Sequence, residues 1–349
     1  MNAKTDSMPS TEERIRRRGL ELGFSNVGFT KLRDYPEWLE VAKERPNYGI
    51  FVDADDALLS RLSKAKTLNL WAKTIVCATL GYSHIDYPEN LLKSVARTYL
   101  SRAYSPQPGT VHAFQVDSLA DFLESMGMRV ERNQFTVPQR LACAEAGIVT
   151  FGNNNFAYTE QDGSFAIMVT YLVDAELEPS GTEVANGCPP DCDLCAKACP
   201  TGAIAGPCEL DLARCILFNN QRFSPGEQEG IWAEMGERIH GCDVCQVVCP
   251  RNHSVLENAF LEDPFLEELS REFDLEKVLL LDEEYYEGVV RPIMYNYIKD
   301  LDIFRRNAAV ALGNTGDPSH LPSLYEARDS NDNPEVIKAI DWAIRRLER

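Results

Sequence analysis

The sequence has no long hydrophobic run. No segment approaches the roughly 18 consecutive apolar residues by which a membrane-spanning helix is recognised. The first 26 residues contain arginines, but no apolar stretch follows them as it would in a secretion signal. We therefore expect no membrane association and a cytoplasmic location.

Positive charge is also scarce. The chain has 35 lysines and arginines against 54 aspartates and glutamates, which gives a formal net charge of −19. Such a surface repels phosphate backbones on average, so nucleic acid is a disfavoured partner. The length of 349 residues allows two domains, or one large domain with appendages, and a hydrophobic content of 44% is sufficient for a buried core.

Cysteine, in contrast, is concentrated in one place. The chain has 11 cysteines, and nine of them lie between Cys188 and Cys249. A disulfide framework is not expected, because no secretion signal is apparent and the cytosol keeps thiols reduced. Clustered cysteines in such a chain indicate bound metal.

The N-terminal half predicts a mixed domain. Ser10 and Glu13 have the spacing of a capping box, so a helix is expected to begin between them. Compact apolar runs from Thr74 and from Phe165 predict two buried strands. Apolar residues at helical spacing within residues 116–130 predict a helix between the strands. This alternation indicates an α/β or α+β domain.

The C-terminal third differs from the rest in charge. Residues 256–349 contain 21 acids against 11 bases. The last 46 residues read as two or three short helices interrupted at "GNTGDP" and "DSNDNP", like one helical repeat. A single repeat cannot bury its own apolar face, so we expect it to pack on the rest of the chain. We divide the chain into a mixed N-terminal domain (1–185), a cysteine-rich domain (186–255) and an acidic helical region (256–349).

The cysteine spacing is that of paired iron–sulfur clusters. Bacterial ferredoxins use C-x2-C-x2-C-x3-C-P, in which three cysteines bind one [4Fe–4S] cluster and the fourth binds the other. The first group here is C-x3-C-x2-C-x3-C-P, one residue longer in its first loop, and the second is C-x2-C-x3-C-P. The second group needs one more sulfur, for which Cys208 and Cys215 are the candidates.

We assign eight cysteines to two clusters and leave Cys208 over. A pair of structural zinc sites, which also use C-x2-C pairs, is the alternative, but the doubled C-x2-C-x3-C-P favours clusters. One cluster takes Cys188, Cys192, Cys195 and Cys249, and the other takes Cys199, Cys215, Cys242 and Cys245.

Four other residues are expected to be structural or unremarkable. Cys77 falls in a predicted strand and Cys143 in a predicted helix, where a free cysteine behaves as a small buried apolar residue. His240 and His253 flank the second cysteine group, and we expect both to be ordinary, partly exposed histidines.

The residues around the cysteines resemble a known family. "LDLARCILFNNQ" (210–221) and "ERIHGCDVCQVVCPRN" (237–252) are similar to the D-x-x-R-C-I and G-C-D-x-C-Q-x-x-C-P-x-N stretches of the epoxyqueuosine reductases. A generic ferredoxin has no need for Arg214, Gln246 or Asn252 at these positions. "RRNAAVALGN" and "NPEVIKAIDWAIRRL" are similar to the HEAT-type repeat of that family, and the resemblance covers most of the chain.

The resemblance implies an architecture and a chemistry. It implies a nitroreductase-like corrin-binding N-terminal domain, a ferredoxin-like double [4Fe–4S] module and a C-terminal HEAT-like repeat. It implies an oxidoreductase in which electrons from a low-potential donor, a ferredoxin or flavodoxin, pass through both clusters to a base-off cobalamin. The protein would hold the corrin, exclude water and place a proton donor.

The chain departs from the family where the proton donor is expected. With Arg140 as anchor, Asn133 stands in place of the family's aspartate, and asparagine is not a general acid. Tyr104 is the substitute donor that we place in the catalytic site beside Asn133, with Tyr99 and His112 as alternatives. In the glycine-lysine-asparagine stretch of the family the lysine is replaced. The resemblance assigns Arg140, Gly152, Asn153 and Asn154 to cofactor binding.

The sequence leaves three candidate functions to be tested. The first is a cobalamin-dependent iron–sulfur reductase of a small organic substrate, which we favour because the missing aspartate and the acidic C-terminal third depart from what a tRNA substrate requires. The second is epoxyqueuosine reduction in tRNA. The third is a ferredoxin-like electron-transfer or activation protein that has lost the corrinoid.

Overall fold

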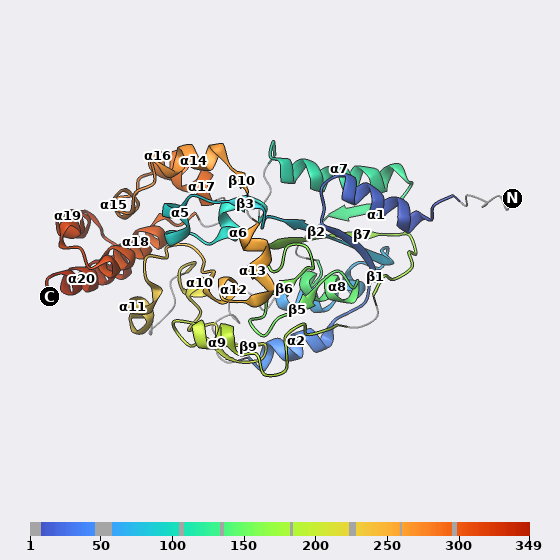
Figure 1. Ribbon diagram of the computed structural model, residues 1–349, viewed down its shortest axis with the longest axis horizontal. Coiled ribbons are helices and arrows are strands. Elements are labelled where there is room, and N and C mark those ends of the chain that lie inside the picture. The colour runs from blue at the N-terminus through green and yellow to red at the C-terminus, as the bar shows by residue number, and fades with distance from the viewer. Residues whose placement is uncertain are drawn as a thin grey trace.

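The computed structural model describes residues 8–45, 58–104, 108–132, 136–181, 184–222, 228–258, 260–294 and 299–349. Figure 1 shows a sheet with its helices at one end of the elongated molecule and a group of C-terminal helices at the other. The cysteine-bearing segments lie between these two ends.

The N-terminal part is built on a four-stranded sheet of β1 (Asn26–Lys31), β2 (Thr74–Gly81), β7 (Ala166–Val173) and β4 (Val130–Arg132), in that order. The two strands predicted from the sequence are the central pair, β2 and β7. Every neighbouring pair runs antiparallel. Parallel strands joined by crossover helices would define an α/β sheet, so the α/β alternative is wrong for this sheet and the α+β alternative is the one observed.

Helices cover both faces of this sheet. α1 (Thr11–Glu21) and α7 (Val111–Ser125) bury apolar side chains against one face, and α8 (Gln139–Glu145) does so against the other. Cys77 on β2 and Cys143 on α8 are both fully buried in the second of these cores, as predicted. The sheet is thus enclosed between two separate apolar layers.

The start of α1 shows how the sequence sets a local boundary. The Ser10 hydroxyl accepts a hydrogen bond from the Glu13 backbone N–H at 3.2 Å, and the Glu13 carboxylate accepts one from the Ser10 N–H at 2.8 Å. The predicted capping box is therefore confirmed, and it satisfies two backbone donors that the first helical turn leaves without partners.

A third core occupies the opposite end of the molecule. It joins α5 (Glu89–Ser94), α11 (Trp232–Met235), α18 (Leu301–Thr315) and α20 (Pro334–Leu347). The expected packing of the terminal repeat on the rest of the chain is confirmed, because Trp232 of the cysteine-rich segment is fully buried in this core. The core draws residues from each of the three predicted parts of the chain, and their boundaries stay a prediction.

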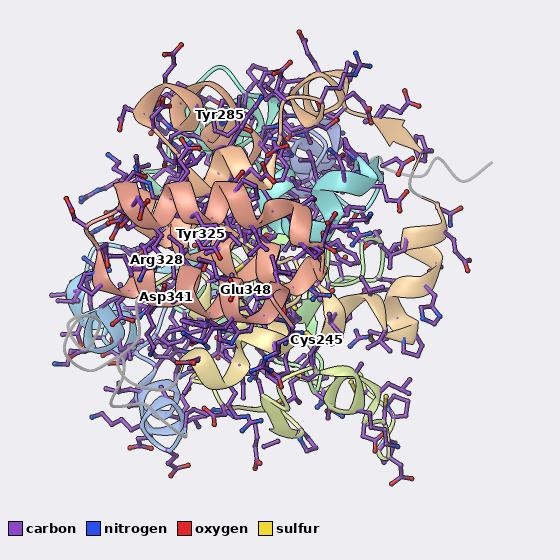
Figure 2. All side chains as sticks on the ribbon, turned by 90° about the vertical axis from the view of Figure 1, so that its left-hand side faces the viewer. Cys245, Tyr285, Tyr325, Arg328, Asp341 and Glu348 are labelled. Carbon is purple, nitrogen blue, oxygen red and sulfur yellow. The ribbon has the colours of Figure 1, made fainter. Side chains whose placement is uncertain are left out.

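The last two helices are also joined at the surface. α19 (Leu321–Ser330) packs beside α20, where the Arg328 guanidinium pairs with Asp341 at 2.6 Å and the Tyr325 hydroxyl donates to Glu348 at 2.6 Å. Figure 2 views these residues from the C-terminal end, with Cys245 on the cysteine-bearing segments below them. The breaks after α18 and after α19 fall at the two predicted interruptions.

Among the described residues, no helix is both long enough and apolar enough to span a bilayer.

Shorter elements connect these layers. The remaining helices are α2 (Pro36–Lys43), α4 (Ala65–Leu68), α6 (Arg97–Leu100), α9 (Leu194–Ala198), α10 (Ile216–Asn219), α12 (Val244–Val247), α13 (Pro250–Glu257), α14 (Pro264–Ser270), α15 (Leu275–Leu279), α16 (Glu283–Tyr285) and α17 (Arg291–Met294). The short strands are β3 (Ile85–Asp86), β5 (Thr150–Phe151), β6 (Ala157–Tyr158), β8 (Ile204–Gly206), β9 (Glu209–Leu210) and β10 (Leu261–Glu262).

Candidate functional site

The structure gathers the cysteines into two neighbourhoods. The thiol of Cys245 is close enough to Cys199, Cys215 and Cys242 for each of them to raise its pKa, after the larger effect of burial. In the same way, Cys188 and Cys192 lie close enough to Cys195 to raise its pKa. Seven of the eight predicted ligands lie in these neighbourhoods, and their division between two clusters stays a prediction. The eighth, Cys249, immediately precedes α13 and lies beside the Tyr158 hydroxyl.

We call the neighbourhood of Cys199, Cys215, Cys242 and Cys245 the inner group and that of Cys188, Cys192 and Cys195 the outer group. Three thiols of the inner group are buried. Burial raises the pKa of Cys242 to about 11 and raises the pKa of Cys215 and Cys245 as well. Backbone N–H groups oppose this: those of Leu217 and Phe218 at the start of α10 lower the pKa of Cys215. Cluster ligands are thiolates, so metal binding here releases protons and compensates buried negative charge.

The spread of these thiols differs from a site for one ion. Across the described ranges, no three Cys, His, Asp or Glu side chains converge closely enough to hold a single metal ion. A [4Fe–4S] cluster attaches each cysteine to a different iron, so its four sulfur ligands stand apart around a larger core.

A turn of the N-terminal domain holds the first cysteine group. The backbone N–H of Asn153 lies 3.3 Å from the Cys188 sulfur, and its side-chain amide donates to the Cys192 carbonyl at 2.8 Å. Asn186 completes the link by donating to the Asn153 side chain at 2.9 Å and accepting from the Cys188 N–H at 2.9 Å. Amide hydrogen bonds to a cluster sulfur are one of the means by which a protein adjusts reduction potential.

The next residue of the same turn reaches the second group. The Asn154 amide donates to the Cys245 carbonyl at 3.0 Å and to the Tyr158 hydroxyl at 2.9 Å, and Asn154 is buried. Gly152 is required at the start of the turn, because a side chain there would lie 2.5 Å from the Tyr158 ring. One turn between β5 and β6 therefore contacts both cysteine groups.

Cys208 lies on the outer side of this turn. Its backbone has a positive φ of 59°, its N–H donates to the Asn153 carbonyl at 2.9 Å, and its thiol lies 3.5 Å from the Gly152 carbonyl. Burial raises the pKa of Cys208, while the guanidinium groups of Arg45 and Arg140 lower it. The Cys188 thiol is also close enough to raise the pKa of Cys208, so Cys208 lies beside the first cysteine group with its thiol directed at a carbonyl, and its omission from the ligand set stays a prediction.

The two arginines bind the same turn. Arg140 donates to the Asn155 carbonyl at 2.5 Å, Arg45 donates to the Cys208 carbonyl, and Asn155 bonds the Cys208 carbonyl at 3.2 Å. Asn155 has a φ of 66°, a left-handed conformation that asparagine tolerates better than most residues. The predicted cofactor residues Arg140 and Gly152–Asn154 are thus brought together around one turn.

A buried polar network holds the second cysteine group. Asn252 donates to the Ser164 hydroxyl and to the Gln246 carbonyl, each at 2.8 Å, and accepts from the Ser164 N–H at 2.9 Å. The Ser164 hydroxyl lies 2.9 Å from the Gln246 side-chain oxygen. Gln246 and Asn252 belong to the motif that singled out the family, and their role here is to fasten α12 and α13 to the N-terminal domain.

Asp243 extends this network. Its carboxylate accepts from the Arg97 backbone N–H at 2.8 Å, from the Arg97 guanidinium at 3.3 Å and from the Gln246 amide at 3.0 Å. Burial raises the pKa of Asp243, and the hydrogen bonds and charge of Arg97 lower it. The carboxylate is therefore held in a pair that excludes most water.

The C-terminal helices close the site from the other side. Asn307 on α18 donates to the carbonyls of Asn220 at 2.7 Å and Ile239 at 2.8 Å. Asn220 and Gly241 in turn exchange two hydrogen bonds of 3.0 and 3.1 Å. Arg306 is also buried and donates to the Asn219 carbonyl at 2.7 Å. The segments that carry Cys215 and Cys242 are thus fixed by one helix.

The predicted catalytic residues have less defined surroundings. Asn133 lies outside the described residues. Tyr104 is 37% exposed and packs edge to face on Tyr99, with ring centres 5.3 Å apart. His112 is at the start of α7, and burial together with the charge of Arg102 lowers its pKa.

His240 differs from the expectation. It is fully buried, not partly exposed, because its ring lies 4.0 Å from the Tyr99 ring and 5.8 Å from the Phe304 ring. Burial lowers its pKa to about 3, so the imidazole is neutral at physiological pH. His253 is exposed on α13, as expected.

Comparison with known proteins supports an iron–sulfur site. Residues 188–252 match a family model described as a 4Fe-4S double cluster binding domain. This match contains all eight predicted ligands, and it favours clusters over the zinc alternative.

Similarity to individual proteins extends over nearly the whole chain. Epoxyqueuosine reductase of Escherichia coli K12 is 27% identical over 351 residues, 97% of this chain and 90% of the relative. That of Staphylococcus aureus NCTC 8325 is 23% identical over 334 residues, 93% and 86% of the two chains. The crystal structure of an epoxyqueuosine reductase with an epoxyqueuosine-modified tRNA-Tyr stem loop has the same fold, with a TM-score of 0.70, 22% identity and coverage of 97% and 98%.

Proposed function

We propose that this oxidoreductase, a member of the epoxyqueuosine reductase-like family, passes low-potential electrons through two [4Fe–4S] clusters to a base-off cobalamin that reduces a small organic substrate. The observation that carries the proposal is the turn at Gly152–Asn155. It belongs to the N-terminal domain and hydrogen-bonds both cysteine groups. A cluster beside Cys188 would then lie against the domain in which reduction takes place.

The cysteines fit two clusters. Backbone N–H groups lie 3.3 Å from the sulfurs of Cys188 and Cys199, and these contacts favour the thiolate and cluster-bound states. The ligand sets we propose are Cys188, Cys192, Cys195 and Cys249 for one cluster and Cys199, Cys215, Cys242 and Cys245 for the other.

The fit to cobalamin rests on charge at the same turn. Asn153 and Asn154 are already engaged by the cysteine loops, so we assign them to holding the clusters near the corrin. Arg45 and Arg140 bring two positive charges to the rim of the turn, which suits an anionic group such as the phosphate of a cobalamin nucleotide loop. When bound, reduced cobalt would supply the nucleophile and reductant. Tyr104 is the residue we propose as proton donor.

Anaerobic reconstitution with iron, sulfide and cobalamin tests this function. The expected product contains about eight irons, as two [4Fe–4S] clusters require, and one cobalt with the visible spectrum of a base-off corrinoid. Absence of corrin binding at micromolar concentration contradicts the reductase and leaves the electron-transfer protein. Iron content near zero contradicts both.

Epoxyqueuosine reduction in tRNA is the second candidate. Full-length similarity to epoxyqueuosine reductases favours it, whereas the net charge of −19 disfavours it. It predicts that a tRNA anticodon stem loop binds at low salt and dissociates as salt rises, because counterion release dominates such binding. A shift in fluorescence anisotropy of a labelled stem loop at low salt would support it, and a flat titration would remove it.

A further inference from the structure

A surface pocket touches one of the proposed cluster ligands. Cys242 lines a pocket of about 420 Å³ formed between α5, α6 and α12. Of the eight proposed ligands, Cys242 alone lines this pocket. Val247, at 42% exposure, opens the pocket to solvent. The remaining lining residues are Leu92, Val95, Ala96, Arg97, Arg238, Gly241, Asp243, Val244 and Val248.

Such a position suits electron entry. Electrons move between a carrier protein and a buried cluster only when the partners' centres approach closely, and a ligand sulfur at a pocket wall shortens that approach. Residues 189–191 of the first cysteine group are exposed in a loop, and no cysteine of that group lines this pocket. The apolar lining of Val244, Val247 and Val248 provides the desolvated centre that a protein interface requires.

The charge of this face differs from that of the whole chain. The lining contains two cations, Arg97 and Arg238, against one acid, Asp243, whereas the whole chain has 35 cations against 54 acids. Asp243 pairs with Arg97, and Arg238 is the second cation at the pocket wall, where it lowers the pKa of both Asp243 and Cys242. An acidic partner is thereby favoured on a chain that otherwise repels one.

We propose that this pocket and its rim, Arg238, Val244 and Val247, are the docking surface of a small, acidic iron–sulfur carrier protein that delivers electrons through Cys242. The inference rests on the proposed clusters but not on the corrinoid. In each transfer the carrier's reduced cluster loses one electron and the cluster that includes Cys242 gains it, so no proton or further reactant is needed.

Stopped-flow reduction of the reconstituted protein tests the surface. An excess of an acidic [2Fe–2S] ferredoxin, reduced electrochemically, is mixed with the oxidised protein, and cluster bleaching is followed at several salt concentrations. For the wild type we expect a rate constant that falls as salt rises. For Arg238→Glu and, separately, Val247→Asp we expect the rate constant at low salt to fall about tenfold, with unchanged reduction by dithionite.

A matched variant provides the control. Lys197→Glu makes the same charge change on α9, where Lys197 is 73% exposed beside the first cysteine group. We expect less than a twofold change in rate for it. Equal slowing by Lys197→Glu and Arg238→Glu overturns the proposed surface, as does wild-type protein that dithionite reduces but the ferredoxin does not. Iron content measured on each sample separates these outcomes from loss of the clusters, and cobalt content separates them from failure of the reductase proposal.

Discussion

The two cysteine groups share a C-D-x-C core but hold its aspartate in different surroundings. Asp193 lies between Cys192 and Cys195, is half exposed and pairs only with Lys197 one helical turn away at 3.0 Å. Asp243 lies between Cys242 and Cys245, is 11% exposed and pairs with Arg97 from another part of the chain. The same short motif is therefore a surface loop in one place and part of the interior in the other.

This difference teaches that the cysteine pattern does not by itself determine how firmly a cluster is held. The first group depends on Asn153 and Asn186 at its edge. The second is fixed by three residues from other parts of the chain, Arg97, Ser164 and Asn307. We expect the second group to carry structural stability and the first to respond mainly in the properties of its cluster.

We expect the largest loss of iron and of thermal stability when an inner cysteine is substituted. Cys245→Ser should reduce iron from about eight to about four per chain or fewer and lower the melting temperature strongly, because it also disturbs the buried second group. Cys195→Ser, the matched position of the C-D-x-C core in the outer group, should reduce iron similarly but affect melting less. Iron analysis and calorimetry on both variants test this, and equal melting temperatures would break the comparison.

The second-largest loss of stability is expected when the cation of the buried Arg97–Asp243 pair is removed. Arg97→Met leaves the Asp243 carboxylate without its charge partner, at an expected cost of about 3 kcal/mol in the free energy of unfolding. A raised carboxyl pKa means that stability is lost as pH rises through the folded-state pKa. The deficit of Arg97→Met should therefore be smaller near pH 5 than near pH 8, as denaturant titrations at both values would show. An equal deficit at both would contradict the account.

We expect a moderate loss in the free energy of unfolding when the buried amide network around Asn252 is disrupted. Asn252→Ala removes two donated hydrogen bonds and leaves the Ser164 N–H without its acceptor, so we expect a loss of about 2 kcal/mol. Asn258→Ala at the exposed end of the same helix removes one bond to the Ser254 carbonyl and should cost less than about 0.5 kcal/mol. Urea unfolding of both variants measures the difference, and similar losses would argue against a special role for Asn252.

The smallest effect is expected at the surface pair. Lys197→Met should change the free energy of unfolding by less than about 0.5 kcal/mol, since both side chains of the Lys197–Asp193 pair are more than half exposed. Side-by-side urea unfolding of this variant and Arg97→Met gives the sharpest form of the comparison. A loss of more than about 1 kcal/mol at Lys197 would show that the outer group is held more firmly than its exposure indicates.

Several elements of the fold and both cysteine groups could be predicted from the sequence. Apolar runs and capping residues predicted β2, β7 and α1, and cysteine spacing predicted the two groups. The direction of the strands could not be predicted, because β2 and β7 are nearly continuous apolar runs, and such runs do not reveal whether neighbouring strands are parallel or antiparallel. The long-range partners were not accessible either: Arg97 and Asp243 are 146 residues apart, and no local pattern links them. The run of asparagines at 153–155 was the one available signal for the turn that joins both groups.

The burial of Arg306 and Asn307 has a consequence for the order of biosynthesis. Their side chains hydrogen-bond carbonyls of the segments that carry Cys215 and Cys242, nearly 70 residues or more before them in the chain. A ribosome exposes those cysteines before it has made the helix that fixes them. We therefore expect stable cluster insertion into the inner group only after α18 has left the ribosome, because a shorter nascent chain has the thiols without the helix that fixes them.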